Sequence, residues 1–597
     1  MPISGLSVAL PTFADTTDND FGALCNPQKI SSVVSAISST KVNIHKIENG
    51  PSFSGGTNFV PASKKLPAYC QVTGSFVTNS ETGKTANFLA TFPENWNGKY
   101  LQLGCFSHCG AILINDAASV AAPIIAQGHP GQIIEKGYAS FSTDEGHTST
   151  AGGSWAIKGP GKVDKDAIED FFYRADQVLA KMGKIFTTEF YTELRNSSQK
   201  PDYSYFAGCS GGGRDAFVAA SYFPEEFDGI VGGSAYDATP VAFHRVGDVL
   251  ATIRSPEADV SPELVALIDP IVKAQCDELD GVKDGLIQNP AACNFDPMRD
   301  LPKCEENSSS QCFTLAQRKT VSVALTAVTD EAGNLVAPGY SISELQATFR
   351  PEVPASSSEA LEPWGEVGGS SLGNWEMGNA TIKIFANKNA PDFYTRHLFS
   401  FESGGSGPTT GFRSIVPRSA VTKVETENRM GIGHTPENWG NFINQDRKFL
   451  MWHNWSDEAL TPYLSTNFYQ QLAQLHGGID KLQDNVRLFM LPGTSHCSIG
   501  GTGPGNFDAI TAIEEWVEKD KAPNSLLAKL YPPSPIIQPE KTPLRTMPLC
   551  KFPEMARYKG KGNINDGNNW YCPEGDKSLL EIGESGRQAG AISINEK

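Results

Sequence analysis

A serine in a glycine-rich turn is the strongest chemical signal in this sequence. The segment Gly208-Cys209-Ser210-Gly211-Gly212 fits the pattern G-x-S-x-G, which places a serine on a sharp turn between a strand and a helix. On such a turn the hydroxyl is exposed and can attack a carbonyl carbon once a base has taken its proton. The same pattern also arises by chance in a glycine-rich chain, so the prediction of a nucleophile depends on its partners.

A serine nucleophile needs a base that takes its proton and an acid that orients the base. In the α/β-hydrolase arrangement these residues follow in the order Ser, Asp or Glu, His, each after a strand. Asp457 follows the strand-like run "KFLMWHNW" and His496 follows "VRLFMLPG", so Ser210, Asp457 and His496 are the predicted triad. A solvated turn is the alternative role for Asp457. His453 is the nearest competitor for the base, but it precedes the acid, within or close to the acid's strand.

A cysteine adjoins both the predicted nucleophile and the predicted base. Cys209 precedes Ser210, and Cys497 follows His496. If serine and imidazole meet at hydrogen-bond distance, the neighbouring Cα atoms fall within the roughly 4.4–6.8 Å that a disulfide spans. We therefore predict a bond between Cys209 and Cys497 that limits positional error between nucleophile and base, which is costly in catalysis. Two buried free thiols are the alternative.

The composition describes a globular chain with an acidic surface. Of 597 residues, 39% are apolar and 19% are charged, and the net charge is −18. Such an excess of negative charge repels phosphate backbones and anionic lipids, so we expect no nucleic acid and no membrane as partner. No apolar run approaches the roughly 20 residues of a membrane-spanning helix.

Twelve cysteines, an even number without any C-x-x-C motif, favour disulfides and an oxidising compartment over structural zinc. Four glycosylation sequons fit an exported protein: Asn196, Asn307, Asn379 and Asn454. The N-terminus lacks the basic segment of a secretory signal, so the signal is absent from this sequence, export is unconventional, or the protein stays inside. Because the cysteines argue against the last option, we predict a secreted, extracellular protein.

Strand-like and helix-like segments alternate along the first third of the chain. Runs at 86–93, 99–106 and 137–147 are typical of strands, 168–191 has helical spacing, and 204–223 reads as strand, glycine turn and helix. This alternation predicts an α/β protein with a largely parallel sheet. It breaks after 229–237 and resumes at 446–462. We therefore predict an α/β-hydrolase fold in two parts, 1–237 and 446–597, with a large inserted lid domain at 238–445 and a pinned coil at the C-terminus.

The Cys-Ser, Asp and His-Cys elements resemble the motif of the tannase and feruloyl esterase family, which also includes mono(hydroxyethyl) terephthalate hydrolase. Segments 92–100, 228–240, 492–497 and 548–565 are similar to family segments too. The resemblance covers nearly the whole chain. It implies a Ser-His-Asp acyl-enzyme mechanism on small aromatic esters, such as those of plant polyphenols and cell walls, with no organic cofactor.

The oxyanion of the reaction intermediate needs two backbone donors, one of which is the N–H after the nucleophile, at Gly211. The resemblance implies that Gly104 or Cys105, in "LGCFSHCGA", supplies the second donor. Family members usually have a more glycine-rich loop there; we expect Cys105 and Cys109 to bridge each other. We interpret His108 as a pocket-edge or surface residue rather than a metal ligand.

The resemblance also assigns the substrate pocket to the lid. Leu460 matches a pocket-wall position of the family. The lid contains five large aromatic residues, most of which we expect in its own core: Trp364, Trp375, Phe385, Phe393 and Phe412.

The segment 276–293, "CDELDGVKDGLIQNPAAC", carries three aspartates, Asp277, Asp280 and Asp284. Its spacing does not match an EF-hand, and an acidic surface loop is an equal alternative. The resemblance implies a structural Ca²⁺ in the lid, held by these carboxylates and by the carbonyls of Val282 and Leu286. By the same resemblance the remaining disulfides are Cys276–Cys293, Cys25–Cys70, Cys304–Cys312 and Cys550–Cys572.

Taken together, the sequence predicts a secreted serine carboxylesterase that hydrolyses esters of hydroxycinnamic or hydroxybenzoic acids, such as ferulic or gallic acid. Two alternatives stay open. One is another serine hydrolase on the same fold, a lipase or a peptidase. The other is a binding protein that derives from an esterase and has lost its chemistry.

Overall fold

The computed structural model describes most of the chain, namely residues 18–44, 56–64, 66–112, 132–148, 153–159, 161–305, 311–343, 360–361, 365–366, 374–403, 411–427, 432–532 and 541–594. The N-terminal stretch 1–17, the sequon at Asn307 and the lid residue Trp364 lie outside these ranges.

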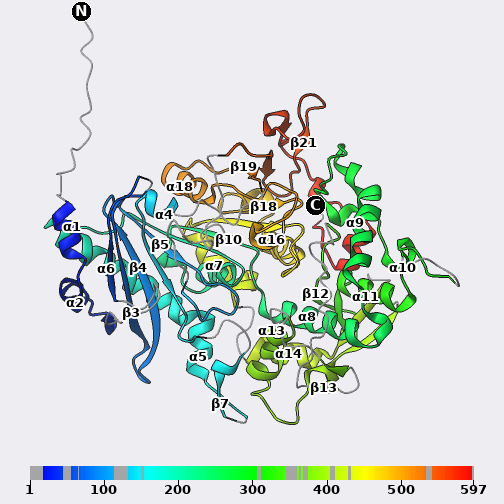
Figure 1. Ribbon diagram of the computed structural model, residues 1–597, viewed down its shortest axis with the longest axis horizontal. Helices are drawn as coiled ribbons and strands as arrows, with labels where there is room; N and C mark the ends of the chain where they lie inside the picture. Colours follow the sequence, from blue (N-terminus) through cyan, green and yellow to red (C-terminus); the bar gives the residue numbers. More distant parts are fainter. Residues whose placement is uncertain are drawn as a thin grey trace, which may run out of the picture.

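A ten-stranded sheet runs through the centre of the molecule (Figure 1). Its order is β1-β3-β4-β6-β5-β9-β10-β17-β18, with β2 paired to β3. The six strands from β6 to β18 are parallel, whereas β1 to β4 pair antiparallel. The predicted α/β class with a largely parallel sheet is confirmed. The strands are β1 (Val42–Ile44), β2 (Thr57–Val60), β3 (Tyr69–Asn79), β4 (Lys84–Pro93), β5 (Lys99–Leu103), β6 (Ala139–Thr143), β9 (Tyr203–Cys209), β10 (Gly229–Gly233), β17 (Lys448–Asn454) and β18 (Val486–Leu491).

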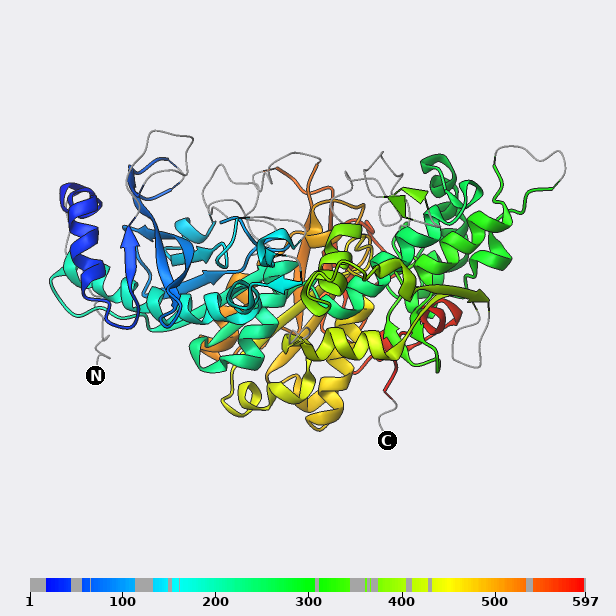
Figure 2. The same cartoon turned by 90° about the horizontal axis from the view of Figure 1, so that it is seen from below.

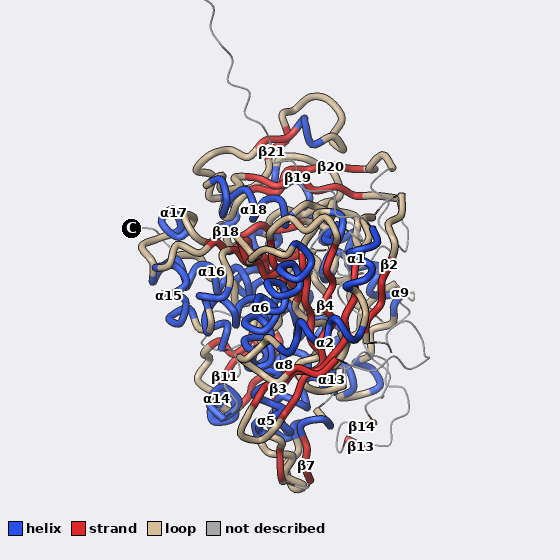
Figure 3. The backbone as a smooth tube through the Cα atoms, turned by 90° about the vertical axis from the view of Figure 1, so that its left-hand side faces the viewer, coloured by secondary structure: helices blue, strands red, loops and turns tan. Residues whose placement is uncertain are grey.

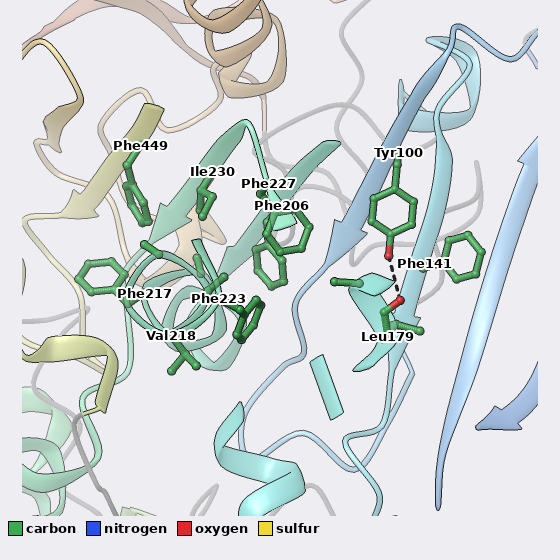
Figure 4. Packing of buried hydrophobic residues seen from close by; sticks show 14 of the residues in the cluster. Tyr100, Phe141, Leu179, Phe206, Phe217, Val218, Phe223, Phe227, Ile230 and Phe449 are labelled. Atoms are coloured by element: carbon green, nitrogen blue, oxygen red, sulfur yellow. Dashed lines mark hydrogen bonds between the residues drawn. The ribbon is translucent and has the colours of Figure 1, made fainter. Parts of the chain in front are cut away.

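Helices cover both faces of the sheet because side chains alternate across each strand. On β9, Phe206 faces one layer and packs with Phe217 of α7 in one core (Figure 4). Its neighbours Tyr205 and Ala207 face the opposite layer, where Trp516 of α18 is buried. The first layer contains α1 (Asp18–Leu24), α2 (Pro27–Ser35), α6 (Ala175–Arg195), α7 (Gly211–Tyr222), α15 (Gly440–Asn444), α16 (Tyr463–Leu475) and α17 (Ile479–Leu482); the second contains α4 (Gln132–Glu135) and α18 (Ala509–Lys519).

The helix predicted over 168–191 is one continuous helical stretch. It begins as α5 (Lys165–Glu169), passes through a π-helical turn at Asp170–Arg174 and continues as α6 to Arg195. A short hairpin of β7 (Ile157–Gly159) and β8 (Lys162–Val163) precedes it.

The lid is inserted between β10 and β17, which are neighbours in the sheet. It lies at one end of the molecule, drawn in green (Figures 1 and 2). Of the predicted lid aromatics, Trp375, Phe385 and Phe412 are buried, and Phe393 is partly buried against the lid core. The lid elements are α8 (Ala238–Ile253), α9 (Pro262–Cys276), α10 (Pro297–Asp300), α11 (Leu315–Leu325), α13 (Asn374–Asn379), α14 (Arg418–Glu427), the sheet of β12 (Leu335–Ala337), β11 (Val328–Asp330), β16 (Phe412–Val416) and β15 (Ser400–Ser403), and the pair β13 (Ala360–Leu361) and β14 (Gly365–Glu366).

The last residues of the predicted insertion belong to the catalytic part. Trp439 and Phe442 are buried in the same core as Phe217 and Phe449, under the sheet. This segment, which the predicted boundary at 445 assigns to the lid, therefore packs against helix α7.

The C-terminal tail contains more regular structure than a pinned coil. β19 (Ser525–Leu530) and β20 (Arg545–Cys550) form an antiparallel pair, as do β21 (Arg557–Tyr558) and β22 (Trp570–Tyr571). These pairs lie at the end of the molecule opposite β7 (Figures 1 and 3). The final helix, α19 (Glu584–Ala589), reaches the lid, where the N–H of Ala327 donates to the carbonyl of Gln588 at 2.8 Å.

All six predicted disulfides are present, with Cα–Cα distances of 5.0–6.0 Å: Cys25–Cys70, Cys105–Cys109, Cys209–Cys497, Cys276–Cys293, Cys304–Cys312 and Cys550–Cys572. Within the described ranges, no helix has both the length and the apolar character to cross a membrane. The sequon at Asn196 is exposed, but Asn454 is fully buried in β17, so a glycan cannot occupy it in the folded protein.

Candidate active site

Ser210 occupies a sharp turn between β9 and α7. Its φ of 65° and ψ of −118° are strained for a residue with a side chain. The turn closes because its flanks are glycines: a Cβ added at Gly208 would lie 2.3 Å from the carbonyl oxygen of Gly212. The N–H of Ser210 donates to the carbonyls of Gly233 and Ser234, both at 3.1 Å. The backbone thus fixes the serine at the carboxyl edge of the sheet.

Asp457 and His496 lie at the same edge, after β17 and β18. His496 Nδ1 is 2.8 Å from Asp457 Oδ2. The Cα atoms of Cys209 and Cys497 are 6.0 Å apart and their sulfurs are bonded, so the base lies one residue from a covalent link to the turn that holds Ser210. The structure therefore brings together the three residues of the predicted triad.

A second histidine contacts the same carboxylate. His453 Nε2 is 3.3 Å from Asp457 Oδ2 and 3.1 Å from the carbonyl of Leu460, while Nδ1 is 2.7 Å from Ser465 Oγ. Because Nε2 faces two acceptors, it carries the proton, and Nδ1 accepts from the Ser465 hydroxyl.

Only one of the two histidines can relay a proton to or from the serine. Both nitrogens of His453 are engaged, and its side chain is fully buried. Among the residues that the structure describes, the contact of His496 Nε2 is with Cys497 Sγ, at 3.6 Å, and that sulfur is already in the disulfide. His496 is therefore the candidate base, and His453 holds the acid in place.

The charges of the acid and base stabilise each other. Burial pushes the pKa of Asp457 upward, but the imidazoles of His496 and His453 outweigh burial and hold this pKa well below its ordinary value. Burial lowers the pKa of His496, but the Asp457 carboxylate more than offsets that effect, so the pKa of His496 is raised. The geometry thus favours an anionic acid and a basic imidazole.

Two further residues support the acid turn and were missed by sequence reasoning. The carboxylate of Glu458 accepts the backbone N–H of His496 at 2.9 Å, and burial together with the charge of Asp457 raises the pKa of Glu458. Arg245, from the lid helix α8, donates through Nη2 to the carbonyl of Ala459 at 2.6 Å. The only sequence signal for Glu458 is its position beside Asp457, and for Arg245 there is none.

The two residues predicted for the second oxyanion donor are already engaged. The N–H of Gly104 donates to the carbonyl of Ala207 at 3.0 Å, as part of strand pairing, and the N–H of Cys105 donates to Asp215 Oδ2 at 3.1 Å. In contrast, the N–H of Gly211 has no acceptor among the described residues. The first predicted donor is therefore available, whereas Gly104 and Cys105 are not.

Two more predicted positions prove to be buried. His108 is fully buried, and its Nε2 lies 3.4 Å from the hydroxyl of Tyr236, so it is neither a pocket-edge nor a surface residue. Leu460 is also buried; its N–H donates to Asp457 Oδ1 at 2.7 Å, and its side chain packs in a core that includes lid residues.

The predicted calcium loop is rich in buried carboxylates. Asp277 Oδ1 accepts the N–H of Gly285 at 3.1 Å, Asp280 Oδ2 accepts from Gln288 at 2.8 Å, and Asp284 Oδ2 contacts Arg545 at 2.6 Å. Burial and the charges of the other two aspartates raise the pKa of Asp280 to about 6. Among the described residues, Arg545 forms the ion pair with one of these three carboxylates, and Arg557 contacts the backbone carbonyl of Asp280, so the carboxylates keep excess negative charge. A set of hard oxygen ligands with this charge fits Ca²⁺.

A serine on a sharp strand-to-helix turn, an aspartate and a histidine thus lie at the carboxyl edge of a largely parallel sheet, the arrangement typical of α/β hydrolases. A family model described as tannase and feruloyl esterase matches residues 70–573. The chain therefore belongs to the tannase and feruloyl esterase family, a family of carboxylic ester hydrolases.

Individual relatives agree with this assignment. The chain is 26% identical to an uncharacterised esterase of Xanthomonas campestris, over 96% of this chain and 95% of that protein. It is 26% identical to a probable feruloyl esterase of Arthroderma benhamiae, over 86% and 88% of the two chains. In fold it matches the crystal structure of feruloyl esterase B from Aspergillus oryzae with a TM-score of 0.68, at 23% identity, over 93% of this chain and 100% of that one.

Proposed function

We propose that this protein is a serine carboxylesterase that hydrolyses esters of aromatic acids through an acyl-enzyme. The observation that carries the proposal is the 2.8 Å contact between His496 and Asp457 on a loop that is disulfide-bonded to the turn of Ser210. Neither a solvated acid nor an isolated histidine explains this arrangement.

In the first half of the reaction, Ser210 Oγ attacks the ester carbonyl carbon while His496 Nε2 takes the hydroxyl proton. Asp457 holds the Nδ1–H tautomer and stabilises the imidazolium. The N–H of Gly211 donates to the developing oxyanion. When the tetrahedral intermediate collapses, the C–O bond to the alcohol breaks and His496 returns its proton to the leaving oxygen.

In the second half, a water molecule repeats the attack on the acyl-serine. His496 takes a proton from the water, the bond between carbonyl carbon and Ser210 Oγ breaks, and the serine regains its proton. The free aromatic acid is the product. The chain supplies every group that this sequence of steps uses.

The names of the family and of the relatives support an aromatic acyl group, of the hydroxycinnamic or hydroxybenzoic type. Three of the described lid aromatics are buried in cores, as expected for residues of the lid core. Leu460, beside the acid, remains the proposed pocket residue. We also assign to this function an extracellular location, supported by six disulfides.

The proposed calcium is structural. Asp277, Asp280 and Asp284 would hold it through carboxylates, and Val282 and Leu286 through backbone carbonyls. When bound, the ion neutralises the excess charge of the loop. It takes no part in the steps at Ser210.

The test is hydrolysis of methyl ferulate, methyl p-coumarate and methyl gallate, with S210A as the control. We expect turnover of at least one aryl ester and none by the variant. Faster cleavage of long-chain alkyl esters would indicate a lipase, and cleavage of peptides a peptidase. If an organophosphonate fails to label Ser210 in the folded protein, the chain is a binding protein and the proposal is wrong.

A further inference from the structure

We propose that the backbone N–H of Phe106 is the second donor to the oxyanion, and that the Cys105–Cys109 disulfide and Asp215 together hold this donor in place. The inference rests on the proposed esterase function, because an oxyanion forms only in that reaction. It assigns a catalytic contact to a loop whose two predicted donors are already engaged.

Most of the backbone N–H groups of the loop 104–110 whose hydrogen bonds are known already have an acceptor and so cannot donate to the oxyanion. The N–H of Gly104 and that of Cys105 donate to Ala207 and Asp215, as described above. Further along, the N–H of Cys109 donates to the carbonyl of Phe106 at 2.9 Å, and that of Gly110 to Asp144 at 3.1 Å. The N–H of Phe106 has no acceptor among the residues that the structure describes. It shares this property with the N–H of Gly211.

The orientation of the Cys105–Phe106 peptide supports the same residue. The carbonyl of Cys105 accepts the N–H of Gly212 at 2.9 Å and so points at the buried start of α7. In a trans peptide the N–H points opposite to the carbonyl, so the N–H of Phe106 points away from the helix. Phe106 is 39% exposed whereas Cys105 is 5% exposed, so the chain turns from the interior towards the surface at this peptide.

The loop lies directly against the residue that carries the other donor. A Cβ added at Gly211 would be 2.4 Å from the carbonyl oxygen of Ser107 and 3.1 Å from Cys105 Sγ. Only glycine at 211 allows the loop to come this close. The amides of Gly211 and Phe106 therefore belong to two backbone segments that are in contact, one of them next to Ser210 in the chain.

Two devices fix the loop on either side of Phe106. The disulfide between Cys105 and Cys109 closes a ring of five residues around it. Asp215, which accepts the N–H of Cys105, is itself held by Arg214, whose Nη2 lies 2.5 Å from Asp215 Oδ1 and 2.8 Å from Glu145 Oε2. The guanidinium also stacks on Phe171 at 3.9 Å. Arg214 thus ties Asp215 to Glu145 inside the protein, and a donor held by such fixed partners need not move during the reaction.

Comparison of F106P with F106A tests the donor. Proline removes the N–H, whereas alanine removes the ring and keeps the N–H, so the ratio of the two activities isolates the amide. We expect kcat of F106P to be about 10²–10³-fold below that of F106A, the usual loss for one oxyanion donor, with KM changed much less. An aryl boronic acid, which mimics the tetrahedral intermediate, should bind F106P more weakly, while the product acid binds both alike.

A second set of variants tests the same donor without proline. D215A should lower kcat more than D215N, because the asparagine oxygen still accepts the N–H of Cys105. C105A/C109A should also lower kcat, whereas C304A/C312A, which removes another short-range disulfide in the lid, serves as the matched control. The inference is overturned if F106P folds and keeps kcat within about threefold of F106A, or if D215A and C105A/C109A leave kcat and boronate affinity at the level of C304A/C312A. Wild-type turnover together with an inactive S210A shows in each case that the esterase function itself stands.

Discussion

Asp457 and the lid loop at 277–284 both contain buried carboxylates, but their surroundings shift the carboxylate pKa in opposite directions. Two imidazoles surround Asp457, and they hold its pKa below the ordinary value despite burial. In the lid loop one guanidinium faces three carboxylates, and burial with mutual repulsion raises the pKa of Asp280 to about 6. The first site is complete within the chain. The second has a charge deficit that a cation would fill.

This difference separates a reacting site from a structural one. An acid that must stay anionic during proton transfer is supplied with partners by the fold itself. A loop whose acids repel one another gains stability when a cation binds to it. The balance of charge around a buried carboxylate therefore indicates its role more directly than its spacing in the sequence.

The sharpest test of the comparison exchanges one acid from each site for its neutral amide. D457N should lower kcat by about 10⁴-fold, because the amide no longer fixes the His496 tautomer. D280N should leave kcat at nearly the wild-type level, since Asp280 takes no part in the reaction. Steady-state kinetics on one aryl ester, with circular dichroism as a check of folding, measures both. Equal losses of kcat in two folded variants would contradict the division into reacting and structural acids.

Removal of the covalent link should have the next largest effect. C209A/C497A frees the base loop from the serine turn, and displacement of about 1 Å costs about 10²-fold in rate. Unfolding should also become easier by about 2–5 kcal/mol. C25A/C70A, a disulfide at the far edge of the sheet, controls for stability. If both double variants lose activity only in proportion to their unfolded fraction, the bond does not position the site.

The effect of D280N on the melting temperature should have opposite signs with and without calcium. A bound ion at 100 times its Kd stabilises the folded state by about 2.7 kcal/mol, so a chelator should lower the melting temperature. In the chelated protein D280N should raise it, because the substitution removes repulsion; with calcium present D280N should lower it, because a ligand is lost. Differential scanning fluorimetry at pH 7 measures all four states. Identical melting temperatures with and without calcium would show that this loop does not bind the ion.

The same loop predicts a pH dependence with a definite sign. The pKa of Asp280 is about 6 in the folded chain and about 4 in an unfolded one, so between these values the folded state binds more protons. Stability of the calcium-free protein should therefore rise as pH falls from 7 towards 5. D280N should flatten this part of the curve, measured by urea unfolding.

The smallest effect concerns the acidic limb of the activity profile. Because the pKa of His496 is raised by Asp457, and the base must be neutral, kcat/KM should fall with decreasing pH around a midpoint above 6.5. H453Q weakens the support of Asp457, so it should lower kcat about tenfold and move this midpoint. S465A, which removes the partner of His453 Nδ1, should shift it in the same direction but less. A midpoint that stays fixed in both variants would reduce His453 to a packing residue.

Much of the site was predictable because the cysteines that mark the serine and the histidine are their direct neighbours in the sequence. Cys209 beside Ser210 and Cys497 beside His496 specify one another, and the alternation of strands and helices specifies the sheet. Contacts between distant residues that no neighbouring motif marks left no such signal. Asp215 accepts the amide of Cys105 across 110 positions, and that single bond removes a predicted oxyanion donor.

Other differences arise from packing. Trp439 and Phe442 lie in a segment that we predicted to be part of the irregular lid. Their rings pack against α7 in the catalytic core instead. His108 is buried although it lies in a short polar loop, since the Cys105–Cys109 ring turns it inward against Tyr236 and Phe171. Neither outcome follows from periodicity, which describes local structure only.

The bond from Cys209 to Cys497 spans 288 positions, with the whole lid between its ends. A ribosome adds about 5–20 residues each second, so the serine is incorporated roughly 15–60 seconds before its base. During that interval β10 also lacks its neighbour β17. The nascent chain therefore cannot hydrolyse an ester until most of its length has been synthesised. Its proposed active site is among the last parts of the molecule to be completed.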